Sequence, residues 1–280
     1  MKTSAFDYYL PPEQIAQKPV MPRDASRLLV LHRQESRLEH RIFRDITEYL
    51  NPGDVLVFNQ TRVIPARLTG RKVTTGGRVE FLLLACEDER TWRGLIGGRH
   101  VAVGTRLVFT GEDGAAVEAT VVAEGERSER VLRFDQPLRP LLDRLGEVPL
   151  PPYIHEPLDD PERYQTVYAR IEGSAAAPTA GLHFTPELLV DLRQKGVRMA
   201  YCTLHIGLDT FQPISEENIE DHRMHTERAV LTTEDARIIN EAKLAGGRIV
   251  AVGTTAVRTL ETAALCSAGA MGDPYSARGD

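Results

Sequence analysis

The feature that most restricts the fold is the long stretch Arg67–Asp135, which carries short strand-like runs and no helical pattern. Glycine-containing turns separate runs such as Arg78–Leu84, Arg106–Phe109 and Val117–Val122. Closely spaced turns between short strands are typical of a small barrel or sandwich. The sequence therefore predicts an all-β module in the first half of the chain.

The second half alternates between helical and strand patterns instead. Thr185 can cap a helix, and the strand-like run Val197–Leu204 follows that helix. A second helix is predicted from Thr232, followed by the buried strand Arg248–Val252 and a further helix from Ala256. Alternating helices and strands indicate an α/β core.

The first residues add strands at Leu28–Leu31 and Val55–Phe58, with a short helix predicted between Ile42 and Leu50. The simplest architecture is an α/β (mixed α+β) core domain with an inserted small all-β barrel domain. We assign residues 1–66 and 139–280 to the core and residues 67–138 to the barrel. The chain stops at Asp280 within a predicted loop, so we expect the core to be truncated at its C-terminal end.

Composition excludes several classes of protein. The longest purely apolar run, Phe81–Cys86, is far shorter than the roughly 18 residues of a membrane span, and no apolar leader follows Met1. Three widely spaced cysteines cannot build a disulfide framework, so we expect a cytoplasmic protein. The net charge of −6 excludes nucleic-acid binding over the whole surface and requires a local basic patch for any such partner.

A loop of small residues, Gly173–Thr185, is the first candidate site. Its glycines, including Gly181, allow close approach of a ligand, and Thr179 adds a hydroxyl. His183 lies just before the capped helix, whose N-terminal amides favour an anion. This histidine is a candidate general base, and the alternative is a tightly packed loop with a hydrogen-bonded histidine.

His205 follows a predicted strand, and ligands of α/β sheets collect beyond the carboxyl ends of strands. The alternative is a buried histidine that donates to a carbonyl group. Thr254 and Thr255 follow Gly253 at the start of a helix, which suits a phosphate or carboxylate, although a plain connection with a capping threonine explains them equally well. Arg258 on that helix is expected to be a solvated charge.

His222, His225 and Glu227 could hold a zinc ion if a further ligand were present. The two-residue gap between the histidines is common by chance, and no cysteine or His-Glu-x-x-His pattern accompanies it. We therefore expect no metal here, and a substrate contact or a surface turn is favoured.

The basic residues gather in one stretch without an acidic residue between Arg62 and Glu80. Such a cluster can contact a phosphate backbone, or it can be the solvated face of the barrel. Its members are Arg62, Arg67, Arg71, Lys72 and Arg78.

Several segments together resemble the S-adenosylmethionine:tRNA ribosyltransferase-isomerases of queuosine biosynthesis. They are long, keep their order and spread over nearly the whole chain. The segments are Phe6–Tyr8, Pro22–Leu28, Asn59–Arg67 (NQTRVIPAR), Gly146–Ile154 (GEVPLPPYI), Arg163–Ala169, Gly173–Thr185, Thr203–Phe211, Met224–Glu227 and Val252–Thr255.

The resemblance implies a core domain with an inserted barrel, and it implies a reaction. The ribosyl part of S-adenosylmethionine is transferred to 7-aminomethyl-7-deazaguanine at the wobble position of tRNA and isomerised. Epoxyqueuosine forms, and adenine and methionine leave. S-adenosylmethionine is then a co-substrate, no separate cofactor or metal is expected, and the partner is tRNA carrying that base. We expect a monomer without membrane contact.

The resemblance also suggests roles. His183, His205 and Glu227 are the candidate catalytic residues: the histidines move protons, and Glu227 orients a histidine or holds an amine. Arg62 suits the methionine carboxylate or a tRNA phosphate. The other candidates are Thr179, Gly181, His225, Thr254 and Thr255 for substrate, and Arg67, Arg71, Lys72 and Arg78 for tRNA.

Three alternatives remain open. Family members continue for some tens of residues beyond the position of Asp280, so the chain could be a non-catalytic fragment that binds tRNA or S-adenosylmethionine. A methyltransferase would use the same donor, but no glycine-rich donor loop stands near the N-terminus. A zinc hydrolase built on His222 and His225 is the most distant alternative.

Overall fold

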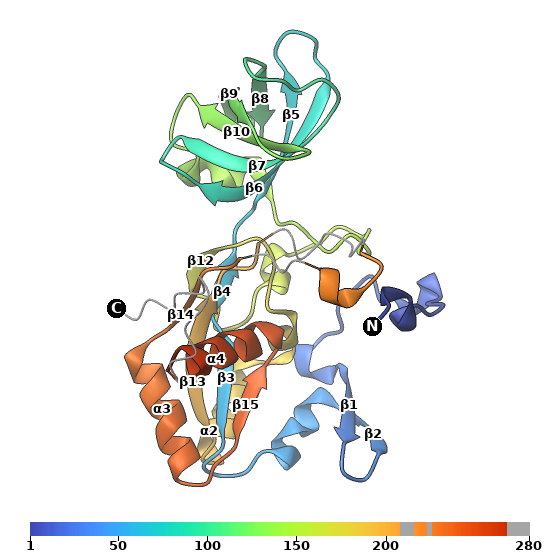
Figure 1. Cartoon of the computed structure of the whole chain (residues 1–280), viewed down its shortest axis with the longest axis vertical. Coiled ribbons are helices and arrows are strands. Elements are labelled where there is room, and N and C mark those ends of the chain that lie inside the picture. Colours follow the sequence, from blue (N-terminus) through green and yellow to red (C-terminus); the bar gives the residue numbers. More distant parts are fainter. Residues whose placement is uncertain (208–215, 223–225, 268–280) are drawn as a thin grey trace. The chain divides into compact units, whose positions relative to one another are not determined.

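The computed structural model describes residues 1–207, 216–222 and 226–267 (Figure 1). The chain divides into two compact units. The core unit comprises Met1–Arg62, Pro152–Glu172 and Ala177–Asp280, and the barrel unit comprises Val63–Pro151 and Gly173–Ala176. The prediction of a mixed α/β fold that contains an antiparallel barrel is confirmed.

The barrel unit contains a 7-stranded antiparallel sheet in the order β11-β5-β6-β7-β10-β9-β8, and a further pairing of β5 with β8 closes it into a barrel. Side chains alternate between interior and exterior along strands such as β6 and β9, and β10 departs from this at a bulge between Val131 and Leu132. The strands are β5 (Arg67–Lys72), β6 (Arg78–Cys86), β7 (Thr91–Gly97), β8 (Arg106–Thr110), β9 (Ala116–Glu124), β10 (Glu129–Phe134) and β11 (Gly146–Glu147).

Three phenylalanines fill the interior of the barrel. The ring centroids of Phe81, Phe109 and Phe134 lie 5.9–6.5 Å apart. Gly94 makes room for them, because a Cβ atom there would stand 2.6 Å from the Phe81 ring. The short helix α1 (Leu142–Leu145) adds its leucines to the same core.

The core unit is built on a 4-stranded sheet in the order β14-β13-β3-β15. Strands β13 (Arg198–Leu204) and β15 (Ile249–Val252) run parallel to the central β3 (Val55–Asn59), and β14 (Ala229–Leu231) runs antiparallel to β13. Every residue of β3 is buried, and its apolar run Val55–Phe58 is typical of a central parallel strand covered on both faces.

Helices cover both faces of this sheet. On one face α2 (Pro186–Gln194) and the 3-10 helix η4 (Phe43–Tyr49) pack against Leu56 and Phe58 of β3. On the other face α3 (Thr233–Leu244) and α4 (Thr254–Ser267) pack against Val55 and Val57. The helix predicted between Ile42 and Leu50 is therefore present as a 3-10 helix.

The predicted helix starts at Thr185 and Thr232 are confirmed. The Thr185 hydroxyl accepts from the amide of Leu188, and the Thr232 hydroxyl accepts from the amide of Asp235, each at 3.1 Å. Helix α4 begins at Thr254, earlier than the predicted Ala256, because Gly253 turns the chain at a φ of +88°.

The remaining elements are short. Strands β1 (Arg27–His32) and β2 (Arg37–Ile42) form a hairpin, and β4 (Thr61–Val63) pairs with β12 (Ile171–Ser174). No helix among the described residues is long and apolar enough to cross a membrane. The 3-10 helices used below are η3 (Arg23–Ala25), η6 (Pro161–Tyr164) and η7 (Thr179–His183).

Candidate active site

The carboxyl ends of the parallel strands place several predicted residues at one edge of the core sheet, here called the carboxyl edge. Asn59 ends β3, His205 follows β13 and Gly253 follows β15. Helix α2 ends at the opposite edge, where the Gly196 carbonyl accepts from the amide of Gly53 at 2.9 Å. The beginning of α2, and with it η7, therefore lies toward the carboxyl edge.

The η7 segment contacts this edge directly. A Cβ atom on Gly253 would stand 3.4 Å from the Cβ of Ala180. Gly181 packs against the segment that follows η6: a Cβ atom there would stand 2.0 Å from the Tyr168 hydroxyl oxygen and 3.0 Å from the Thr166 methyl. The structure thus brings Thr179, Gly181, His205, Thr254 and Thr255 to the same edge.

His183 is held by its neighbours at one ring nitrogen. Nδ1 lies 2.8 Å from the Ser26 hydroxyl, and the ring packs 5.1 Å from the ring of Phe43. Burial lowers the pKa of His183, and the nearby positive charge of Arg163 lowers it further. The imidazole is therefore neutral at neutral pH and can accept a proton.

His205 is also expected to be neutral, but its Nδ1 atom, unlike that of His183, has no hydrogen-bond partner among the described residues. That atom is buried and makes no hydrogen bond to any residue the structure describes. Its backbone amide donates to the Arg228 carbonyl at 3.1 Å, which fixes the position of the residue. Burial lowers the pKa of His205, and the charge of Arg228 adds to this effect. Within the described residues, the Nδ1 atom of this neutral imidazole is therefore free to accept a hydrogen bond from a ligand.

Glu227 lies at the same edge in a buried ion pair. Its side chain is 5% exposed, pairs with Arg258 of α4 and accepts from the amide of Gly207 at 3.2 Å. Glu227 therefore joins α4 to the segment that follows His205. The expectation that Arg258 is a solvated charge is wrong, because the packing of α4 on the sheet places its guanidinium against a buried carboxylate.

Buried hydroxyl groups without partners surround these residues. Among the described residues no hydrogen bond reaches the side-chain oxygens of Thr61, Thr166, Tyr168 and Thr255. Burial also raises the pKa of Tyr168, so its phenol stays neutral. Buried polar atoms in native proteins are normally satisfied by protein or water, so these oxygens are open to a hydrogen bond from outside the described residues.

Sequence reasoning did not single out Thr61, Thr166 or Tyr168. All three lie in segments that carry the family resemblance, Asn59–Arg67 and Arg163–Ala169, and this was the only signal that could have found them. Arg23 was missed as well. It donates to the carbonyls of Gln165 at 2.7 Å and Glu162 at 2.9 Å and so fixes the segment that carries Thr166.

Arg62 is engaged with an acidic partner, since its guanidinium forms an ion pair with Glu162. A substrate carboxylate or phosphate that binds Arg62 would have to displace the Glu162 side chain. His225 lies outside the described residues. His222 contacts Glu216 at 3.2 Å, and the described residues contain no group of three or more histidine, cysteine or acidic side chains that could hold a metal ion.

The basic residues predicted for tRNA lie on β5 and β6 of the barrel unit. Arg67 lies 3.6 Å from Glu80, and Arg71 donates to the Gly76 carbonyl at 3.2 Å. Lys72 donates to the carbonyls of Arg99 and His100. Arg78 makes no side-chain hydrogen bond or ion pair within the described part of the chain.

Comparison with known proteins identifies the family. Residues 3–277 match the family described as "Queuosine biosynthesis protein". A protein of Moorella thermoacetica named S-adenosylmethionine:tRNA ribosyltransferase-isomerase is 56% identical over 269 residues, which cover 94% of this chain and 78% of the relative. Proteins of the same name from Symbiobacterium thermophilum and Clostridium kluyveri are 55% and 52% identical, each over 94% of this chain and 77% of the relative.

Among solved structures, the crystal structure of S-adenosylmethionine tRNA ribosyltransferase from Thermotoga maritima is 41% identical, with a TM-score of 0.43. The match covers 92% of this chain and 72% of that one. The match to the family over almost the whole chain, together with relatives above 50% identity, shows that this chain belongs to the queuosine biosynthesis protein family.

Proposed function

We propose that this chain transfers the ribosyl group of S-adenosylmethionine to 7-aminomethyl-7-deazaguanine at the wobble position of tRNA and isomerises it. Epoxyqueuosine is formed, and adenine and methionine are released. The observation that carries this proposal is the identity of 52–56% to enzymes of that name over 94% of the chain. The neutral histidines and unpartnered hydroxyls at the carboxyl edge supply groups that such a reaction needs.

The reaction requires a base that removes a proton from the 5′ carbon of the donor, which the sulfonium acidifies. His205 is our candidate, because its Nδ1 is unpartnered among the described residues and its lowered pKa keeps it neutral. His183, held by Ser26, is the candidate for a second proton transfer. Glu227 acts as a positioning residue, since it holds the Gly207 amide two residues beyond His205.

The remaining candidates serve binding in this scheme. Thr254 and Thr255 lie in the first turn of α4, where backbone amides favour an anionic group. Thr179 and Gly181 lie on η7, and Gly181 packs against the Tyr168 hydroxyl and the Thr166 methyl. Arg62 serves the methionine carboxylate or a tRNA phosphate after exchange with Glu162. His225 remains a candidate substrate contact.

We also propose that the barrel is an insertion in the core domain. The predicted insertion, residues 67–138, lies inside the range Val63–Pro151 of the barrel unit, and core-unit segments precede and follow it in the sequence. S-adenosylmethionine acts as co-substrate in this scheme, without a metal or a further cofactor. The monomeric state and the cytoplasmic location stay predictions.

The test is to incubate the purified chain with S-adenosylmethionine and tRNA that carries 7-aminomethyl-7-deazaguanine, and to measure the products by mass spectrometry. Adenine and epoxyqueuosine, formed only when both substrates are present, are the expected result. Binding of tRNA without adenine release would support the non-catalytic fragment instead. S-adenosylhomocysteine as product would indicate a methyltransferase.

The rate should depend on pH through the neutral histidines. Both have a pKa below the ordinary 6.5, because burial disfavours the imidazolium. We therefore expect kcat/KM to be constant above about pH 7 and to fall only when the pH drops below 6.5, as the base becomes protonated. A profile measured from about pH 5 to 8 checks this, and a fall that begins above pH 7 would contradict it.

Gly181→Ala should reduce activity by placing a methyl group 2.0 Å from the Tyr168 oxygen. Overpacking of this kind costs about 1–3 kcal/mol, so we expect kcat/KM for S-adenosylmethionine to fall roughly tenfold. Tyr168→Phe in the same chain removes the clashing oxygen and should restore part of the loss. Gly97→Ala, which makes only ordinary contacts in the barrel unit, is the matched control, and equal losses in both variants would contradict the argument.

A further inference from the structure

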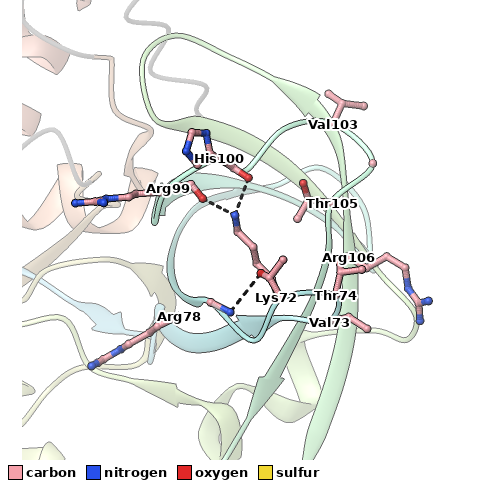
Figure 2. A pocket seen from close by; sticks show the side chains of 12 residues that line it. Lys72, Val73, Thr74, Arg78, Arg99, His100, Val103, Thr105 and Arg106 are labelled. Atoms are coloured by element: carbon pink, nitrogen blue, oxygen red, sulfur yellow. Dashed lines mark hydrogen bonds between the residues drawn. The ribbon is translucent and has the colours of Figure 1, made fainter.

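One end of the barrel carries an open hollow of about 960 Å³ (Figure 2). The ends of β5, β6 and β8 line it, together with the connections 73–77 and 99–105. Its ionisable lining consists of Lys72, Arg78, Arg99, His100 and Arg106, and no aspartate or glutamate lines it. In a chain of net charge −6 this is a concentrated positive surface.

One arginine of this surface, Arg78, lies opposite a like charge on the neighbouring strand, Arg71, which does not itself line the hollow. Arg71 and Arg78 are direct partners in the antiparallel register of β5 and β6, so their side chains share one face. Directly opposed like charges destabilise a strand pair. Within the described residues Arg78 makes no direct side-chain hydrogen bond or ion pair. A bound anion would relieve the repulsion between the two arginines.

Lys72 fixes the rim of the hollow. Its ammonium group donates to the Arg99 carbonyl and, at 2.7 Å, to the His100 carbonyl, which ties β5 to the connection after β7. In Figure 2 the side chains of Arg99 and Arg78 extend toward the same side of the hollow. Arg106 differs, because it forms an ion pair with Glu118 on the neighbouring strand. Two exposed guanidinium groups, Arg78 and Arg99, are thus presented from a fixed backbone.

We propose that this hollow binds backbone phosphates of tRNA, with Arg78 and Arg99 as the principal contacts. The proposal rests on the proposed function, which names tRNA as the partner. Guanidinium groups bind phosphates in bidentate fashion, and contacts to the backbone position a nucleic acid independently of its sequence. The open form of the hollow suits a polyanion that passes across it. Lys72 then serves as a structural support for the rim.

The test is a double variant, Arg78→Gln with Arg99→Gln, assayed for tRNA binding by fluorescence anisotropy at several salt concentrations. We expect affinity to fall about tenfold, which corresponds to about 1.4 kcal/mol, because two exposed phosphate contacts are lost. The slope of log K against log salt should become shallower by roughly one unit for each arginine.

The matched control removes two arginines at the other end of the barrel. Arg90 precedes β7, whereas Arg99 follows it, and Arg133 of β10 pairs with Thr91 at the start of β7. The double variant Arg90→Gln with Arg133→Gln makes the same change in net charge and should keep the affinity and salt slope of the wild type. Thermal unfolding of both variants establishes that the barrel is intact.

The proposal would be overturned if the Arg78→Gln, Arg99→Gln variant kept the tRNA affinity and salt slope of the wild type. It would also be overturned if the control variant lost as much tRNA affinity as this variant. Binding and adenine release are scored separately, so the two proposals fail in different ways. If the wild type binds tRNA through the hollow but releases no adenine, only the proposed function fails. If it releases adenine and the variant binds tRNA normally, only the present inference fails.

Discussion

Replacing His205 with glutamine is expected to slow adenine release by about 10²–10⁴-fold at neutral pH, with little change in tRNA affinity. Glutamine keeps a polar side chain but cannot take up a proton. The expectation follows from the position of His205 beyond β13 and from its buried Nδ1, which has no partner among the described residues. A positioned general base contributes a factor of this size.

Backbone hydrogen bonds on both sides of His205 hold this candidate base in place. The amide of His205 is bound to the Arg228 carbonyl, and the Gly207 amide is bound to Glu227. Glu227 in turn pairs with Arg258 of α4. These contacts hold the backbone on both sides of the imidazole, so little reorganisation is needed when the proton moves.

Two comparison variants make the result specific. His40→Gln changes an exposed histidine of the β1–β2 hairpin and should leave the rate unchanged. His183→Gln should lower the rate less than His205→Gln, because His183 already shares one ring nitrogen with Ser26. The rate would be measured from adenine in single turnovers. Full activity of His205→Gln would contradict the role as base. It would support the alternative from the sequence analysis, a buried histidine with a structural role only.

Local signals allowed part of this fold to be predicted. The caps at Thr185 and Thr232 depend on residues three positions apart, so the sequence alone locates the starts of α2 and α3. The closely spaced glycine turns between short strand-like runs similarly predicted the barrel strands. His205 was predicted to follow a strand, and it was chosen as a candidate because ligands of α/β sheets collect beyond the carboxyl ends of strands.

Long-range packing decided what the sequence could not show. Glu227 and Arg258 are 31 residues apart and meet only because α4 packs on the sheet. A hydroxyl without a partner, as at Thr61, is a property of the folded chain and has no sequence signature. The basic stretch ending at Arg78 was visible, but Arg99 joins it only through the pairing of β6 with β7 and the contact of Lys72 with the Arg99 carbonyl.

The second large effect concerns stability. Asp54→Asn should destabilise the core unit by about 3 kcal/mol at neutral pH. Asp54 is 2% exposed and accepts from the amides of Asn51 at 2.8 Å and Arg248 at 2.9 Å, while the Arg248 guanidinium pairs with it. The carboxylate thus joins the start of β3 to the start of β15, and asparagine would lose the ion pair.

The pH dependence of this effect has a defined sign. Hydrogen bonds from the Arg248 side chain are the main cause that lowers the pKa of Asp54 from 3.8 to about 2. The stabilisation, on the order of 2 kcal/mol, is therefore present above the unfolded-state pKa of 3.8 and is lost as the pH falls toward 2. The difference in stability between wild type and Asp54→Asn should shrink over this window.

Two probes separate the units in a urea titration. The single tryptophan, Trp92, is buried in the barrel, whereas helices α2, α3 and α4 belong to the core unit. Asp54→Asn should shift the helical circular-dichroism transition to lower urea and leave the tryptophan fluorescence transition in place. Asp113→Asn, which breaks an exposed ion pair with Arg144 in the barrel, should shift neither transition measurably. An Asp54→Asn transition at the wild-type urea midpoint would show that the β3–β15 junction is held by the apolar contacts of the sheet alone.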